Sequence, residues 1–146
     1  MVLAMADAPD REIRATVIGH VESTLTSRAG APRQPDEGAP AAWLVFEPPV
    51  HAALQSLRPG DRIVVLTWLD QANRDVLVVH PRGDAGRALA GVFSTRSPDR
   101  PNPIGLHETE VVAIEGLRVQ VRQLEAIDGT PILDVKPALA CRADAR

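Results

Sequence analysis

The sequence predicts a mainly β protein, a small closed or nearly closed β-barrel of about seven or eight strands with one short helix. Short apolar or alternating segments recur between turns rich in Pro, Gly and Asp. Only one segment has helical spacing, and helices do not alternate with strands as in a doubly wound sheet. The 146 residues suffice for one domain with a core. Aromatic residues make up 3% of the chain, so Val, Leu, Ile and Ala must build that core.

Each expected element follows from a local pattern. The expected strands cover residues 12–21, 41–47, 62–69, 75–79, 108–114, 117–124 and 132–135, and a short apolar run begins at Gly91. The run at 62–69 is almost continuously apolar, which predicts a central strand buried on both faces. Residues 49–57 are the expected helix, because two prolines precede apolar residues at helical spacing.

Turn residues separate these segments. Glu115-Gly116 predicts a hairpin, and Asp128-Gly129-Thr130-Pro131 predicts a tight turn, because Asp and Gly tolerate a left-handed backbone. Residues 23–40 form a long connection, and long loops in compact domains tend to be functional or disordered.

We expect a barrel domain over residues 11–142, with a disordered start at 1–10 and a tail at 143–146. The start lacks a basic region followed by a long apolar one, so it does not resemble a signal peptide. No apolar run approaches the ~20 residues that cross a membrane. The expected location is therefore the cytoplasm.

The net charge of −3 excludes binding of a polyanion by bulk attraction. The segment from His80 to Gly105 nevertheless carries four arginines against two aspartates. A basic stripe on an acidic body can dock one anionic partner.

Several kinds of active site are excluded. The chain has no glycine-rich dinucleotide fingerprint, no phosphate-binding P-loop and no G-x-S-x-G elbow. The single cysteine, Cys141, allows no disulfide. His20, His51, His80 and His107 lack metal-ligand spacing, so we expect surface or packing histidines and no metal. Carboxylate pairs such as Asp128 with Asp134 are expected on solvated strand edges, so they do not support glycosidase chemistry.

The stretch 91–106, GVFSTRSPDRPNPIGL, is the strongest functional candidate. Pro98, Pro101 and Pro103 fix the backbone and remove three donors, which excludes a helix or a central strand. A stiff loop that carries two arginines suits an anionic ligand, because its geometry is prepared before binding. The alternative is a surface loop whose arginines are merely solvated.

The sequence resembles the TsaA-like, or TrmO, family. Four blocks carry the resemblance in the family's order: PRQP at 32–35, GVFSTRS running into RPNPIGL at 91–106, DGTP at 128–131 and DVKP at 134–137. The resemblance implies a β-barrel, S-adenosylmethionine-dependent methyltransferase outside the Rossmann class. It implies methylation of N6 of threonylcarbamoyl-adenosine at tRNA position 37, by a homodimer with the active site at or near the subunit interface.

Residues that match family motifs are expected to serve three roles. Cofactor contacts are expected at Pro32, Arg33, Gln34, Asp70, Gln71, Arg96, Leu106, Leu124, Glu125, Ala126 and Asp128. An arginine would hold the methionyl carboxylate, and Leu106 and Leu124 would offer apolar surface to the adenine ring. RNA contacts are expected at Arg100, Asn102 and Lys136.

A general base is expected, because the acceptor nitrogen is bonded to a carbonyl and is a poor nucleophile until its proton leaves. Asp128 and Asp134 are the candidates, with Lys136 as an electrostatic partner. For Asp128, a purely turn-forming role is the alternative.

Two positions depart from the family pattern: Asp70 replaces a usual histidine, and Ala138 replaces an aromatic residue after Lys-Pro. The methyl acceptor therefore stays open. The alternatives are a methyltransferase for another RNA or a small amine, and a module that binds S-adenosylmethionine or RNA without catalysis.

Overall fold

The computed structural model describes residues 11–32 and 37–139. These residues divide into two compact units, which are described separately. Leu69–Ile104, with residues 11–15, form the small unit. Thr16–Trp68 and the chain from Gly105 onward form the barrel unit. None of the helices in the described ranges has the length and apolar character needed to cross a membrane.

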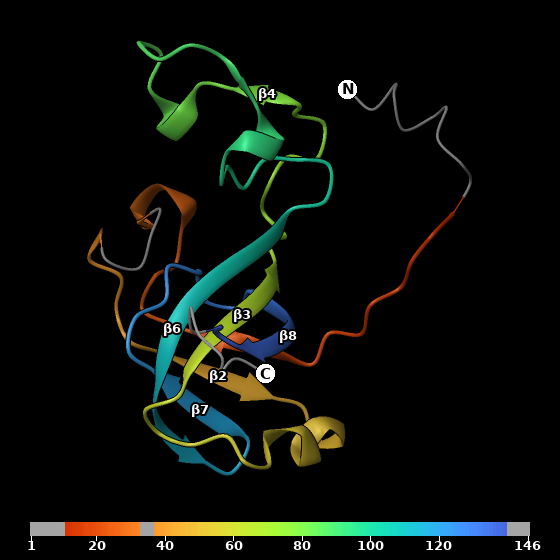
Figure 1. Ribbon diagram of the computed structural model, residues 1–146, viewed down its shortest axis with the longest axis vertical. Coiled ribbons are helices and arrows are strands. Elements are labelled where there is room, and N and C mark those ends of the chain that lie inside the picture. The colour runs from red at the N-terminus through yellow and green to blue at the C-terminus, as the bar shows by residue number, and fades with distance from the viewer. Residues whose placement is uncertain (1–10, 33–36, 140–146) are drawn as a thin grey trace. The chain divides into compact units, whose positions relative to one another are not determined.

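Six strands close into a barrel in the order β1-β2-β7-β6-β3-β8 (Figure 1). The strands are β1 (Gly19–Glu22), β2 (Ala42–Phe46), β3 (Arg62–Trp68), β6 (Ile104–Glu115), β7 (Arg118–Val121) and β8 (Pro131–Pro137). The pairs β1–β2, β1–β8, β2–β7, β6–β7 and β3–β8 are antiparallel, with Val21 opposite Leu44 in the first. Closure leaves no barrel edge unpaired. The predicted barrel fold is confirmed.

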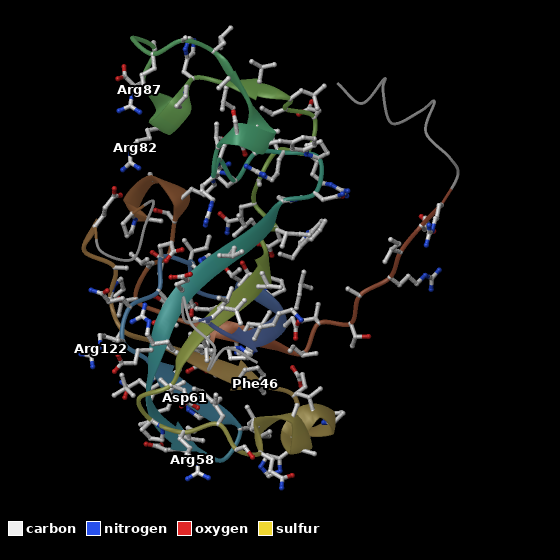
Figure 2. All side chains as sticks on the ribbon, in the orientation of Figure 1. Phe46, Arg58, Asp61, Arg82, Arg87 and Arg122 are labelled. Atoms are coloured by element: carbon white, nitrogen blue, oxygen red, sulfur yellow. The ribbon has the colours of Figure 1, made fainter. Side chains whose placement is uncertain are left out.

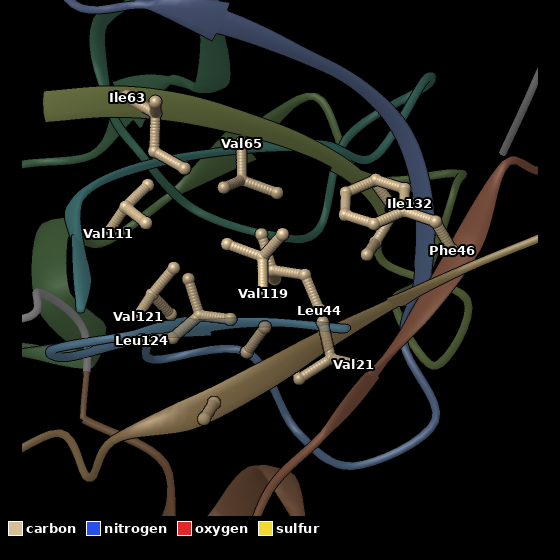
Figure 3. Packing of buried hydrophobic residues seen from close by; sticks show 12 residues of the cluster. Val21, Leu44, Phe46, Ile63, Val65, Val111, Val119, Val121, Leu124 and Ile132 are labelled. Carbon is tan, nitrogen blue, oxygen red and sulfur yellow. The ribbon is translucent and has the colours of Figure 1, made fainter. Parts of the chain in front are cut away.

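Alternating aliphatic residues fill the barrel interior. Figure 3 shows Leu44, Val65 and Val119 pointing toward one another from β2, β3 and β7. All three are fully buried. The scarcity of aromatic residues therefore leaves a core of branched aliphatic side chains, as expected, with Phe46 the one aromatic member of the cluster.

The prediction that segment 62–69 is buried on both faces is wrong. In β3 only Ile63, Val65 and Thr67 are buried, and the residues between them are half-buried. The strand belongs to a barrel, so one face meets the interior and the other lies outside. A continuous apolar run predicts two buried faces only where a second layer covers the sheet.

The expected helix is a 3₁₀ helix, η3 (Pro48–Leu54). Its bonds span three residues, as from the Gln55 N–H to the Ala52 carbonyl oxygen. Two prolines remove donors at its start, and seven residues give little room for α-helical bonds. Val50, Leu54 and Leu57 still pack against the barrel core, whereas Ala53, which shares the apolar spacing, is exposed.

The first strand is shorter and later than residues 12–21. β1 begins at Gly19, because backbone pairing to β2 and β8 begins only there and at Ile18. Ile13 and Val17 are exposed, so their alternation reflects no buried face. The predicted hairpin at Glu115-Gly116 and the turn at 128–131 are both confirmed, the second with Gly129 at φ +84°.

The small unit contains a two-stranded sheet of β4 (Val78–Val79) and β5 (Ala90–Gly91). Two 3₁₀ turns, η4 (Pro81–Gly83) and η5 (Val92–Ser94), flank β5. The expected strand over 75–79 is thus reduced to two residues. Figure 2 shows Arg82 and Arg87 extending from the connection between β4 and β5, where Arg87 pairs with Asp84 at 3.7 Å.

Candidate functional site

The predicted site residues fall into two groups. The small unit carries Asp70, Gln71, Arg96, Arg100 and Asn102, whereas the barrel unit carries Pro32, Leu106, Leu124, Glu125, Ala126, Asp128, Asp134 and Lys136. Arg33 and Gln34 lie outside the described residues, next to the half-buried Pro32. Asp70 and Gln71 are exposed in the turn that follows β3.

Arg100 holds the loop on which it lies. Its Nε donates to the Ser97 carbonyl oxygen at 2.7 Å. Its Nη2 donates to the carbonyl oxygens of Val92 and Thr95 at 2.8 and 2.6 Å. The prolines leave this loop few backbone donors, and the guanidinium supplies the missing ones. Three of the five guanidinium N–H donors therefore serve the loop's own backbone, and an RNA contact at Arg100 stays a prediction.

A second arginine fastens the loop to residues 73–74. Arg74 Nε donates to the Pro101 carbonyl oxygen at 2.7 Å, and its Nη2 donates to Asn102 Oδ1 at 3.1 Å. The Asn73 N–H donates to Asp99 Oδ1 at 2.9 Å. Asn102 therefore uses its side-chain oxygen within the protein. Sequence reasoning missed Arg74, because no local pattern reveals a partner 27 residues away.

Arg96 differs from Arg100. It is exposed, and within the described ranges its side chain makes no hydrogen bond or ion pair. The neighbouring Thr95 Oγ1 accepts from the Ser97 N–H and donates to the Val92 carbonyl oxygen, both at 3.1 Å. The backbone on both sides of Arg96 is thus fixed while its guanidinium stays available for an anion.

Burial divides the cofactor candidates of the barrel unit. Leu106 lies on the outer face of β6 and is 43% exposed, so it can offer apolar surface to a ring. Leu124 and Ala126 belong to the buried core cluster. The prediction that the Leu124 side chain supports an adenine ring is therefore corrected. Glu125 lies between them and is half-buried, and its carboxylate bonds to His107.

A polar triplet closes one end of the barrel interior. His107 Nε2 lies 2.7 Å from Thr67 Oγ1, and His107 Nδ1 lies 2.5 Å from Glu125 Oε1. His107 was expected at the surface or in packing, and it is buried with both ring nitrogens hydrogen-bonded. The alternation of β6 could have revealed the burial of His107. It lies four residues before Val111, so both side chains point to the barrel interior.

Asp128 lies in the turn before β8. Its Oδ1 accepts a 3.0 Å hydrogen bond from the Ser23 N–H, and its own N–H donates to the Leu25 carbonyl oxygen at 2.7 Å. It also borders an open groove on the barrel unit, lined by His20, Glu22, Ser23, Thr24, Ala41, Trp43, Asp128 and Gly129. The carboxylate is exposed and keeps Oδ2 for a further partner. It thus combines the turn-forming role with access to solvent.

Asp134 and Lys136 lie on the outer face of β8. Lys136 Nζ is 2.9 Å from Asp134 Oδ2, and both side chains are about half exposed or more. Asp134 pairs with Leu66 of β3, whereas Asp128 bonds to the chain after β1. The structure therefore joins Asp134 to Lys136 and does not join Asp128 to either. Among the described residues, no cluster of three or more His, Cys, Asp or Glu could hold a metal.

A family model described as the tRNA-methyltransferase O N-terminal domain matches residues 20–144. This chain belongs to that family. The predicted family resemblance is thus confirmed over nearly the whole barrel unit and the small unit.

Relatives and solved structures agree with this assignment. The chain is 40% identical to a probable S-adenosyl-L-methionine-binding protein of Halobacterium salinarum, over 86% of this chain and 98% of the relative. It is 37% identical to the mouse tRNA (adenine(37)-N6)-methyltransferase, over 84% of this chain and 30% of that enzyme. The crystal structure of TrmO from Pseudomonas aeruginosa matches with a TM-score of 0.72 at 30% identity, over 93% of this chain and 61% of that one. This tRNA-methyltransferase O domain therefore spans about three fifths of the TrmO chain.

Proposed function

We propose that this domain is an S-adenosylmethionine-dependent methyltransferase that acts on N6 of threonylcarbamoyl-adenosine 37 in tRNA. The observation that carries the proposal is the family match over residues 20–144. The relatives' names point the same way, to S-adenosylmethionine binding and to N6 of adenine 37. A cytoplasmic location suits an enzyme that acts on tRNA.

The side chains present fit the proposed cofactor. The exposed Arg96 suits the methionyl carboxylate, because a guanidinium makes charge-assisted hydrogen bonds to such a group. The exposed part of Leu106 suits an apolar ring face. Glu125 Oε2 is a buried acceptor without a partner in the described ranges, and it suits a hydroxyl or amino donor. When bound, S-adenosylmethionine supplies a methyl group activated on a sulfonium.

The remaining chemistry is removal of a proton from the acceptor nitrogen. Asp128 is the better candidate for this role, since its carboxylate borders a groove and retains a free oxygen. Asp134 is the second candidate, but Lys136 already holds one of its oxygens at 2.9 Å. Lys136 is more than half exposed, which suits a contact with a tRNA phosphate.

We also propose that the domain forms a homodimer. Within residues 77–93 of the small unit, four apolar residues are at least half exposed: Leu77, Val78, Leu89 and Phe93. Phe93 is 88% exposed, and water contact of a side chain this large is unfavourable. Light scattering tests the proposal: about twice the 15.7 kDa chain mass is expected, and a monomer at micromolar concentration would refute it.

Calorimetry with S-adenosylmethionine tests the cofactor part of the proposal. We expect one cofactor bound per chain, and weaker binding after Arg96→Ala than after the matched surface change Arg58→Ala. Absence of binding by the unmodified protein would exclude both the methyltransferase and the non-catalytic cofactor module. Cofactor binding together with inactivity on tRNA would favour that module or another acceptor.

A further inference from the structure

Three polar side chains from separate parts of the barrel unit form a buried chain. Thr67 comes from β3, His107 from β6, and Glu125 from the segment after β7. Thr67 Oγ1 is 2.7 Å from His107 Nε2, and His107 Nδ1 is 2.5 Å from Glu125 Oε1. Thr67 is 0% exposed, His107 4%, and the Glu125 side chain 11%. Buried polar groups of this kind fix one arrangement, because each alternative leaves a donor or acceptor unpaired.

The bonding pattern assigns the donors. An ionised carboxylate only accepts, so His107 Nδ1 carries the proton that faces Glu125. In the neutral ring Nε2 then accepts from the Thr67 hydroxyl. Each member thereby fixes the orientation of the next, from Thr67 through the imidazole to the carboxylate.

The order hydroxyl, imidazole, carboxylate also occurs in hydrolases, where the hydroxyl is the nucleophile. That role is excluded here, because the Thr67 hydroxyl is fully buried and cannot meet a substrate. The Glu125 side chain is 11% exposed, so the carboxylate is the end of the chain nearest to solvent. Glu125 Oε2 is buried and has no hydrogen-bond partner in the part of the chain that the structure describes. An acceptor left in this state is unfavourable until a donor reaches it.

Gly105 provides the space for this arrangement. A Cβ on Gly105 would lie 2.6 Å from His107 Nε2 and would overlap the Thr67 hydroxyl as well. The glycine of the Pro-Ile-Gly-Leu motif thus borders the hydrogen bond between Thr67 and His107. Its neighbour Leu106 and the acidic Glu125 are both among the proposed cofactor contacts.

We propose that Thr67 and His107 are positioning residues for the cofactor site. They hold the Glu125 carboxylate in one orientation, so that Oε2 accepts a hydrogen bond from a hydroxyl or amino group of bound S-adenosylmethionine. The inference rests on the proposed function, because it needs that cofactor. Neither Thr67 nor His107 touches the ligand; both act through Glu125.

A double-mutant cycle on the full chain tests this inference, with the dissociation constant of S-adenosylmethionine from calorimetry as the readout. Thr67→Val removes the hydroxyl at constant volume and should weaken binding roughly fivefold, the effect of about one hydrogen bond. Thr67→Ser should bind like the unmodified protein. Glu125→Gln should weaken binding roughly tenfold, because its amide can face His107 only with an N–H donor in place of Oε2.

The decisive comparison is Thr67→Val in the Glu125→Gln background. We expect a further change of less than about twofold there, since the hydroxyl then has no carboxylate to position. A full fivefold loss in both backgrounds would show that Thr67 affects binding by a route other than Glu125, and would overturn the inference. The buried Ile63 on the same strand gives a control, whose Ile63→Val change should leave the dissociation constant unaltered.

Two results separate the inference from the proposed function. If the unmodified protein binds no S-adenosylmethionine, the proposed function fails and the inference fails with it. If the unmodified protein binds and the two substitutions are additive, only the inference fails. Thr67→Ala replaces Thr67→Val if the valine variant does not fold.

Discussion

The Arg100 guanidinium donates a 2.6 Å hydrogen bond from Nη2 to the carbonyl oxygen of Thr95. The same nitrogen reaches the Val92 carbonyl oxygen, and Nε reaches that of Ser97. An arginine in a basic, proline-rich loop therefore serves the loop itself. This relationship changes what substitution of Arg100 should do.

Arg100→Ala should loosen the loop. The backbone amides of residues 92–103 should exchange hydrogen roughly tenfold faster or more, because three bonds to a charged donor are lost. The salt dependence of tRNA binding should keep its slope if these bonds to the loop are the whole role of Arg100. A slope reduced by about one would instead identify a phosphate contact at Arg100.

Arg96→Ala should leave the stability of the fold unchanged and weaken cofactor binding. The midpoint of thermal unfolding should stay within about one degree of the unmodified value, because Arg96 bonds to nothing in the described chain. Binding of S-adenosylmethionine should weaken roughly tenfold, the expected effect of one charge-assisted hydrogen bond. Arg58→Ala is the control, and equal affinities for the two variants would remove Arg96 from the cofactor site.

Asp128→Asn separates catalysis from folding. The amide oxygen can still accept from the Ser23 N–H, so the turn before β8 and the affinity for the cofactor should persist. If Asp128 is the general base, kcat should fall by roughly a hundredfold or more. Unchanged turnover would leave Asp128 with its turn-forming role alone.

Lys136→Ala tests the outer face of β8. The ion pair with Asp134 is exposed, so the free energy of unfolding should change by less than about 1 kcal/mol. Contact with a phosphate would lower the salt slope of tRNA binding by about one. Asp134→Asn is the matched change on the other partner. It should lower kcat only if Asp134, and not Asp128, removes the proton.

Strand period and turn chemistry predicted most of the barrel. The hairpin after β6 and the turn at Gly129 depend on residues next to each other in sequence, and both are found where expected. The burial of β3 on one face only depends on barrel closure, which no single segment reveals. The start of β1 depends likewise on its pairing with β2 and β8.

The candidate site also depends on long-range contacts, so the sequence predicted only some of its residues. The family resemblance predicts cofactor contacts at Arg96 and Glu125, whereas the partners that fix their surroundings come from distant segments. Arg74 lies 27 residues from Pro101, and Thr67 lies 40 residues from His107. Long-range contacts of this kind follow from the fold, so the sequence did not reveal that Arg100 donates three hydrogen bonds to its own loop.

Nucleoside mass spectrometry tests the central proposal most directly. The purified domain is incubated with S-adenosylmethionine and with tRNA that carries unmethylated threonylcarbamoyl-adenosine at position 37. The tRNA is then digested, and the masses of its nucleosides are measured. We expect one added methyl group on that nucleoside, and none when the substrate tRNA has plain adenosine at position 37. Unchanged threonylcarbamoyl-adenosine, from protein shown by calorimetry to bind the cofactor, would contradict the proposed function.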